Sequence, residues 1–136
     1  MANMSNWLEQ QLLGAIFKGQ SYSNQTVYVA LCTNTLNDTT TGSQLSEPGG
    51  NYQRQPTTAS DWSVVDGTTL DGTVNNITDI EWEDVTWSDT IVSVALVNQA
   101  SGGEVLFWGQ LVNSKTVSVD DSVRFSVGSL VVQIDD

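Results

Sequence analysis

The chain lacks histidine altogether and contains a single cysteine, and these two absences restrict the chemistry it can perform. Histidine is the commonest general base and transition-metal ligand near neutral pH, so a Ser–His–Asp triad and a Cys–His nucleophile pair are both excluded. With Cys32 alone, no disulfide can form within the chain. Neither a glycine-rich phosphate loop nor a G-x-S-x-G motif occurs. We therefore expect a protein that binds or assembles and is not an enzyme.

Positive charge is also scarce. Four cations (Lys18, Arg54, Lys115 and Arg124) face sixteen acidic residues, and the net charge is -12. Nucleic-acid affinity comes largely from basic residues that neutralise phosphates, so direct nucleic-acid binding is disfavoured. An anionic membrane surface would repel the chain as well. The acidity indicates a surface that keeps the protein soluble, or one that matches a basic partner.

Long apolar runs are missing too. No stretch approaches the length of a membrane span, and residues 1–6 have neither the basic nor the apolar region of a secretory signal. We therefore expect a chain that stays soluble and has no membrane partner. The 136 residues fit one domain, predicted to cover residues 1–136, and a hydrophobic content of 39% supplies a core without a metal or disulfide.

The clearest local pattern is a helix over about residues 6–18. Asn6 is the predicted cap, with Glu9 placed to complete a capping box, and Gly19 ends the helix. Apolar side chains recur at helical spacing and form one wide stripe: Trp7, Leu8, Leu12, Leu13, Ile16 and Phe17. Such a stripe must dock on its own domain, the favoured expectation, or on a neighbouring subunit. We take Trp7, Leu8, Leu12 and Phe17 as interface candidates.

Strands and turns are predicted from about residue 26 to residue 134. Residues 26–33 are apolar on both faces, as in a central strand, whereas residues 34–50 form a long polar loop that is functional or mobile. The strongest strand pair is 90–97 with 104–112, joined by a glycine-containing hairpin loop. Shorter strands are expected within 51–58, 62–64, 80–83, 116–119, 123–127 and 130–134, with turns at Asp66-Gly67, Asp71-Gly72 and Asp120-Asp121. About eight short strands indicate an all-β fold, an antiparallel β-sandwich with one short N-terminal α-helix.

The acidic residues raise two functional alternatives. Glu81 and Glu83 share a face of the predicted 80–83 strand, but the opposite face is hydrophobic, which is typical of a solvated outer surface rather than a catalytic dyad. Calcium needs only oxygen ligands, and its candidates are Asp66 with Asp71, residues 81–84, and Asp120-Asp121. None has EF-hand spacing, and turns favour Asp for local hydrogen bonds. We expect no cofactor, with structural calcium as the weaker alternative.

Two tryptophans and two arginines complete the candidate interface. Trp62 and Trp87 are the tryptophans predicted to be exposed, where a flat ring could stack on a sugar, whereas the other three are expected to pack. Arg54 and Arg124 each alternate with apolar neighbours. Each could form an ion pair between strands of its own chain or a salt bridge between subunits, and the sequence leaves both readings open.

Several segments together resemble a family of small tailed-phage virion proteins known as tail fibre proteins. The residues that carry the resemblance are Asn6–Leu13, Ile16–Gly19, Thr26–Thr33, Gly49–Arg54, Ala95–Val97, Gly102–Leu111, Lys115–Val117 and Val123–Phe125. Within them, Gly49-Gly50-Asn51-Tyr52-Gln53-Arg54 resembles a recurrent glycine-glycine-x-tyrosine-x-arginine element. Their order and spacing cover nearly the whole chain, and the resemblance brings no catalytic residues with it.

The resemblance implies a structural part of a virion, assembled in the host cytoplasm. Our first hypothesis is a capsid decoration or cement protein that binds the outside of the major capsid protein shell as a homo-oligomer, a trimer or dimer. The alternative is a tail or fibre component that recognises a host receptor or glycan through exposed Trp and polar loops. A third hypothesis, the least favoured, is a small hydrolase that uses Glu81 and Glu83 on surface polysaccharide.

Overall fold

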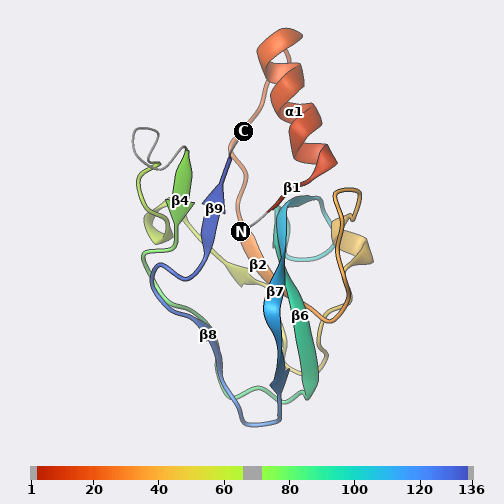
Figure 1. Cartoon of the computed structure of the whole chain (residues 1–136), viewed down its shortest axis with the longest axis vertical. Coiled ribbons are helices and arrows are strands. Elements are labelled where there is room, and N and C mark those ends of the chain that lie inside the picture. The colour runs from red at the N-terminus through yellow and green to blue at the C-terminus, as the bar shows by residue number, and fades with distance from the viewer. Residues whose placement is uncertain (1–2, 66–71, 135–136) are drawn as a thin grey trace.

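The computed structural model describes residues 3–65 and 72–134, which form a β-sandwich with one N-terminal helix (Figure 1). The elements are β1 (Asn3–Met4), α1 (Asn6–Phe17), β2 (Tyr28–Cys32), β3 (Gln55–Pro56), β4 (Thr73–Asn75), β5 (Ile80–Trp82), β6 (Asp89–Val97), β7 (Val105–Val117), β8 (Val123–Phe125) and β9 (Val131–Gln133). Two short 3-10 helices, Gly42–Gln44 and Ala59–Asp61, lie in loops. The predicted all-β antiparallel fold class is confirmed.

The larger layer is a five-stranded antiparallel sheet in the order β1-β7-β6-β2-β3. The predicted hairpin is its centre, and Gly102 and Gly103 take positive φ angles of 62° and 74° in the connecting loop. β7 is longer than expected, because residues 116–117, predicted as a separate strand, continue it and pair with residues 89–90. The predicted edge strand within 51–58 is reduced to the two residues of β3 at the sheet's far edge.

A large bulge interrupts the pairing of β6 with β7. Ile91 pairs with Lys115 while Ser93 pairs with Gln110, so residues 111–114 of β7 face Val92 alone. Val112 at this point is 99% exposed. β1 covers the other side of β7 at residues 107 and 108. The outer edge of the longest strand is therefore covered near its start and bent at its middle.

The smaller layer consists of two antiparallel pairs, β4 with β9 and β5 with β8. The main core lies between the layers, and the clean alternation predicted for residues 80–83 is confirmed, because Ile80 and Trp82 are buried. The strand expected at 62–64 is reduced to a single bridge between Trp62 and Asn76. The predicted Asp66-Gly67 turn and Asp71 lie outside the described residues.

A second, smaller core covers the opposite face of the large sheet. Ala30, Cys32, Ala95, Val97 and Val105 are buried there, under Leu36 of the 34–50 loop. β2 is therefore buried on both faces, as its sequence predicted. The loop is tied down locally, since the backbone N–H of Thr33 donates to the carbonyl of Ser46. The exposed side chains of this loop are polar, but its Leu36 covers the second core on one face of the large sheet.

The last strands are shorter than expected. The predicted strands extend to Val127 and Ile134, but both residues lie beyond the strand ends and are 60% and 53% exposed. β8 ends at Phe125 because the chain then turns, with Gly128 at a φ of 81°. In β9, Val132 is the buried side chain. The second layer therefore covers the large sheet incompletely beside β9.

Candidate interaction surfaces

The helix α1 is anchored to the sheet at its first turn. Ser5 is the N-cap, one residue before the predicted Asn6, and its side chain accepts a hydrogen bond from the backbone N–H of Leu8 at 3.2 Å. The Ser5 hydroxyl also donates to the carbonyl of Val105 at the start of β7. The cap is therefore a buried link to the sheet, and the predicted capping box with Glu9 is wrong because Glu9 lies one position too far from Ser5.

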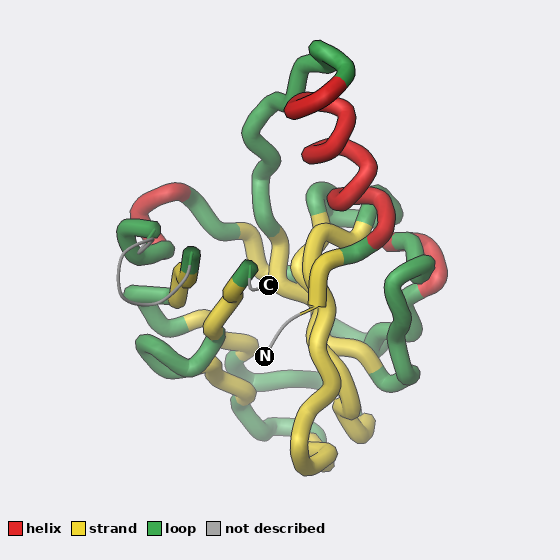
Figure 2. Tube along the Cα trace, turned by 45° about the horizontal axis from the view of Figure 1, so that its top comes forward, coloured by secondary structure: helices red, strands yellow, loops and turns green. Residues whose placement is uncertain are grey.

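Beyond this anchor, α1 projects from the domain together with residues 18–27, which return to β2 (Figures 1 and 2). We call residues 6–27 the finger. At its base Leu8 is buried and Trp7 half-buried, and Leu12 is half-buried further along. The chain folds back so closely that a Cβ on Gly14 would lie 2.0 Å from the side-chain oxygen of Gln20.

The tip of the finger leaves apolar surface uncovered. Leu13, Ile16 and Phe17 are 55%, 70% and 74% exposed, and they lie on one side of the helix at spacings of three and four residues. The favoured expectation, that the apolar stripe docks on its own domain, is therefore correct at Leu8 and wrong at Phe17. An exposed cluster of large apolar side chains is typical of an interaction surface.

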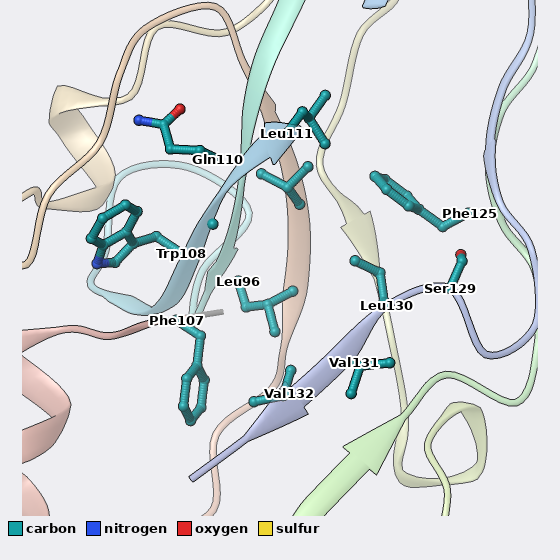
Figure 3. Close-up of a pocket in the computed structure, with 12 residues that line it drawn as sticks. Leu96, Phe107, Trp108, Gln110, Leu111, Phe125, Ser129, Leu130, Val131 and Val132 are labelled. Atoms are coloured by element: carbon teal, nitrogen blue, oxygen red, sulfur yellow. The ribbon is translucent and has the colours of Figure 1, made fainter. Parts of the chain in front are cut away.

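A second apolar surface is a cleft between the two layers (Figure 3). It encloses about 290 Å³, and a neighbouring cavity of about 150 Å³ shares Leu96, Phe107 and Val132 with it. β7 and β9 are not hydrogen-bonded to each other, so the sandwich is open on this side. None of the described residues that line either cavity is charged. The sequence did not predict this cleft. The apolar residues Phe125 and Leu130 indicate that a core forms, but their pattern does not show that the core is open on one side.

Arg54 is buried at the centre of a polar clamp (Glu47, Tyr52 and Arg54). Its guanidinium forms five hydrogen bonds, two to the carboxylate of Glu47 at 2.9 and 3.0 Å and three to the backbone carbonyls of Gly42, Gln99 and Gly102. All five N–H donors are therefore used. The ion pair lies within the chain but joins two loops rather than two strands. Arg54 holds the 34–50 loop and the β6–β7 hairpin loop against the sheet.

Tyr52 extends the clamp into the main core. Its hydroxyl donates to Glu47 Oε1 at 2.7 Å and accepts from the backbone N–H of Leu31 at 3.0 Å. Burial, with the hydrogen bond to the Glu47 carboxylate as the next cause, raises the pKa of Tyr52 well above its usual range. Tyr52 and Arg54 were visible in the sequence as alternate residues of one element, but Glu47 gave no signal beyond its place in a loop.

Arg124 lies in a different environment. It is 59% exposed on β8, and Nη1 is 3.9 Å from both Asp79 Oδ2 and Glu81 Oε1, which gives it weak ion pairs across the β5–β8 strand pair. The neighbouring Glu83 carboxyl, through a hydrogen bond to Glu81, raises the pKa of Glu81. The reading of a strand-to-strand ion pair within the chain therefore fits Arg124.

Trp62 and Trp87 are not the exposed platforms expected from the sequence. Trp87 is 5% exposed, in edge-to-face contact with Tyr52 at a ring separation of 6.2 Å. Trp62 is half-buried, and its indole N–H donates to Thr57 Oγ1 at 3.0 Å. Trp108 is half-buried beside the 34–50 loop and donates to Asp38 Oδ1 at 2.9 Å. These large aromatic side chains contribute to packing, because burying them removes a large apolar area from water.

The described part of the chain contains neither a cluster of side chains that could hold a metal ion nor a helix that could span a membrane. Within residues 3–65 and 72–134, no three acidic or cysteine side chains are grouped closely enough to hold a metal ion. The pair Asp66 and Asp71 lies outside these residues. In the same ranges, no helix has the length and hydrophobicity that a membrane crossing requires.

Comparison with known protein families decides the relationship suggested by the sequence. Residues 3–133 match the family described as podophage GP4 fiber I protein gp80. The chain belongs to this family. No curated protein matches it. As a member of a phage fibre-type family, it is a virion protein, and the coarse expectation drawn from the resemblance is confirmed.

Family membership also distinguishes between the two leading roles considered for the sequence. The family's description names a fibre rather than a capsid, so it favours the alternative hypothesis over capsid decoration, which receives no support. The recurrent glycine-glycine-x-tyrosine-x-arginine element now has a structural role as part of the clamp. This element of the resemblance therefore contributes to the fold.

Proposed function

We propose that this chain is a tail or fibre component that takes part in recognising a host surface glycan and acts without catalysis. The observation that carries the proposal, besides family membership, is the separation of two kinds of surface. The finger tip is apolar and suits attachment to another virion protein, whereas the body is polar and strongly acidic. A component that joins a particle to a cell needs both.

The two kinds of surface lie apart along the longest axis of the molecule. Figure 1 shows α1 at one end and the turns that join β5 to β6 and β7 to β8 at the other. Carboxylates are concentrated on or near these turns: Asp79, Glu81, Glu83, Asp84, Asp89, Asp120 and Asp121. Such charge keeps an exposed end hydrated and suppresses self-association. The finger is therefore the better attachment point, and the acidic end suits exposure to solvent.

The surface best suited to a glycan is the outer side of residues 37–44 with the adjoining Trp108. This stretch is rich in hydroxyl and amide groups, and short-range bonds hold its shape, such as that from the Thr39 backbone N–H to Asn37 Oδ1 at 2.9 Å. The hydrogen bond to Asp38 fixes the orientation of the Trp108 ring. Prefolded polar groups beside a half-exposed ring lose little entropy when they bind a sugar. These features support the proposal.

The proposal is tested with the isolated protein and with phage. We expect the protein to bind a subset of glycans on an array and to compete with phage for adsorption to host cells. Trp108→Phe should weaken both effects several-fold, because it removes a ring donor and shrinks the stacking surface. Trp62→Phe is the matched control, since it also loses an indole hydrogen bond but lies away from this surface.

Two results would contradict the proposal. One is adsorption of the phage that is unaffected by an excess of the protein. The other is antibody labelling of intact virions that places the protein on the capsid shell and nowhere on the tail or its fibres.

A further inference from the structure

The finger and the cleft are two apolar surfaces that the same chain leaves without a partner. Residues 12–17 of the finger contain no polar side chain, so the helix is apolar on every side over its last turns. The side facing the return segment is covered, whereas Leu13, Ile16 and Phe17 face solvent. A helix that is apolar all round is normally buried on all sides. The structure therefore buries one side of the helix tip and leaves the other side, which is equally apolar, exposed.

The finger cannot fill the cleft of its own domain. Its first residue is tied to the body, because the backbone N–H of Asn6 donates to the carbonyl of Asp38 at 2.9 Å, and Ser5 before it bonds Leu106 and Val105 of β7. Its last residue leads directly into β2, whose pairing with β6 is continuous. With both ends fixed, the tip points away from the domain (Figure 2). Within residues 3–65 and 72–134, nothing covers the outer side of the tip.

Charge favours the cleft of a second copy as that cover. The chain carries a net charge of -12, so most surfaces of two copies repel each other. The finger is the exception, since Glu9 and Lys18 are its charged residues and they cancel. The cleft has no charged lining among the described residues. Beside the cleft, in the turn between β8 and β9, the Val127 N–H donates to the Asp79 carboxylate. Lys18 directly follows Phe17 in the finger, so this carboxylate provides a counter-charge for Lys18 of a docked copy.

We propose that the finger tip of one copy inserts into the apolar cleft of another, with Phe17 between the β6–β7 and β8–β9 walls. The contact joins two different surfaces, so it is heterologous, and it builds a ring where the rotation between successive copies closes. Burial of Leu13, Ile16 and Phe17 against the cleft walls supplies the apolar centre of the contact. The proposal rests on the proposed function at one point, because it names a second copy of this chain as the virion protein to which the finger attaches. Glycan binding uses the outer side of residues 37–44, so a failure of assembly and a failure of glycan binding are distinguishable.

A complementation experiment tests the heterologous geometry. One variant, Ile16→Ser with Phe17→Ser, loses the tip but keeps the cleft. The other, Val131→Lys, places a charge at the cleft rim, where Val131 is 41% exposed and tolerates the change, but keeps the tip. By sedimentation velocity we expect the parent protein to be oligomeric and each variant alone to be monomeric. An equimolar mixture of the two variants should form heterodimers, because one intact finger then meets one intact cleft.

A cross-linking experiment identifies the contact directly. Cys32 is fully buried, and burial raises the pKa of its thiol to about 12, so it does not react with maleimides near neutral pH. Copies carrying Phe17→Cys are mixed with copies carrying Val131→Cys and treated with a short bis-maleimide. We expect the mixed product to dominate. Val119→Cys, 52% exposed in the turn after β7, replaces Val131→Cys in the control and should give little product.

Three outcomes would overturn the proposal. A monomeric parent protein in sedimentation would exclude self-assembly. Products joining Phe17→Cys to itself would instead indicate helix-to-helix pairing of two fingers. A mixture of the two variants that stays monomeric would show that the finger and the cleft do not meet. Circular dichroism and thermal unfolding of each variant establish that it is folded, so a loss of assembly cannot come from unfolding.

Discussion

The clamp and the finger tip differ in an opposite way from what their residue types predict: the clamp buries a charged side chain, whereas the tip exposes apolar ones. In the clamp, the charged side chain of Arg54 is 3% exposed, although arginine is normally exposed, and every donor of its guanidinium has an acceptor. At the finger tip, side chains that should be buried are exposed by 55% to 74%. A buried charge must be satisfied internally because desolvation would otherwise unfold the domain. Exposed apolar groups cost the monomer little, and they are available to a partner.

The largest expected effect comes from breaking the clamp. Arg54→Met should destabilise the protein by about 3–5 kcal/mol, because the Glu47 carboxylate loses its counter-ion, keeping the Tyr52 hydroxyl as a donor, and three loop carbonyls lose the guanidinium. Arg124→Met, at the exposed arginine, should change stability by less than about 0.5 kcal/mol. Urea unfolding followed by tryptophan fluorescence measures both. Equal effects of the two substitutions would mean that burial of Arg54 does not set its contribution.

Within the finger, the base and the tip should respond differently. Leu8→Ala should cost about 2–5 kcal/mol, since Leu8 is 4% exposed and the change leaves a cavity against β7. Phe17→Ala removes a larger side chain but should change the stability of the dilute monomer by less than about 0.5 kcal/mol. Thermal unfolding at low protein concentration provides the comparison. A large loss with Phe17→Ala would show that the tip packs on its own domain after all.

A glycine pair tests how tightly the clamp closes the loops. A Cβ on Gly42 would lie 2.0 Å from the carbonyl oxygen of Gly102, a backbone atom that cannot move aside cheaply. Gly42→Ala should therefore cost about 1–3 kcal/mol through overpacking. A Cβ on Gly49 would meet nothing within 4 Å, so Gly49→Ala should be near neutral. If chemical denaturation gave both variants the stability of the parent, the two loops would not be in contact in solution.

Alkaline pH should destabilise the fold through two buried groups that stay protonated in the folded state, Tyr52 of the clamp and Cys32 of the second core. Burial raises the pKa of Tyr52 above its ordinary 10.0 and that of Cys32 from 9.0 to about 12. Well below pH 9 both groups are protonated in either state, so stability is unaffected. Above their ordinary pKa values the unfolded chain releases protons that the folded chain retains. Each group then lowers the unfolding free energy by about 1.4 kcal/mol per pH unit.

The slope of stability against pH measures this effect. Between pH 9 and 11, Cys32→Ala should have a shallower slope than the parent protein, and Tyr52→Phe should lose the part that begins near pH 10. Because slopes are compared, the stability that each substitution itself removes does not interfere. Slopes identical to that of the parent would contradict the pKa shifts.

The sequence predicted the framework well because its periodic patterns are local. The alternation at Ile80 and Trp82, the apolar run of β2 and the glycines of the β6–β7 loop each indicate one structure without tertiary information. The same reasoning failed at Val127 and Ile134. There the alternation continues in the sequence after the strand has ended, because pairing partners and not the pattern set a strand's length.

The candidate site was less predictable, because it depends on contacts between distant segments. Nothing near Arg54 in the sequence shows that its partners are carbonyls of the 34–50 loop and the 98–103 hairpin loop. Trp87 has an acidic and polar neighbourhood in the sequence and yet lies in the core. The helix and its apolar stripe were predicted from the sequence, but whether the stripe docks depends on how far the helix extends beyond the sheet. The helical pattern does not encode that distance.

The bulge in β7 has a consequence for how such proteins can be crowded together. A strand of thirteen residues whose outer edge is paired with β1 at residues 107 and 108 would offer the free N–H and C=O groups beyond them as a template for strands of other chains. Residues 111–114 leave the regular ladder at the middle of this edge, so a foreign strand could align with a short stretch at most. At high protein concentration this edge is therefore protected from amyloid-like pairing between chains.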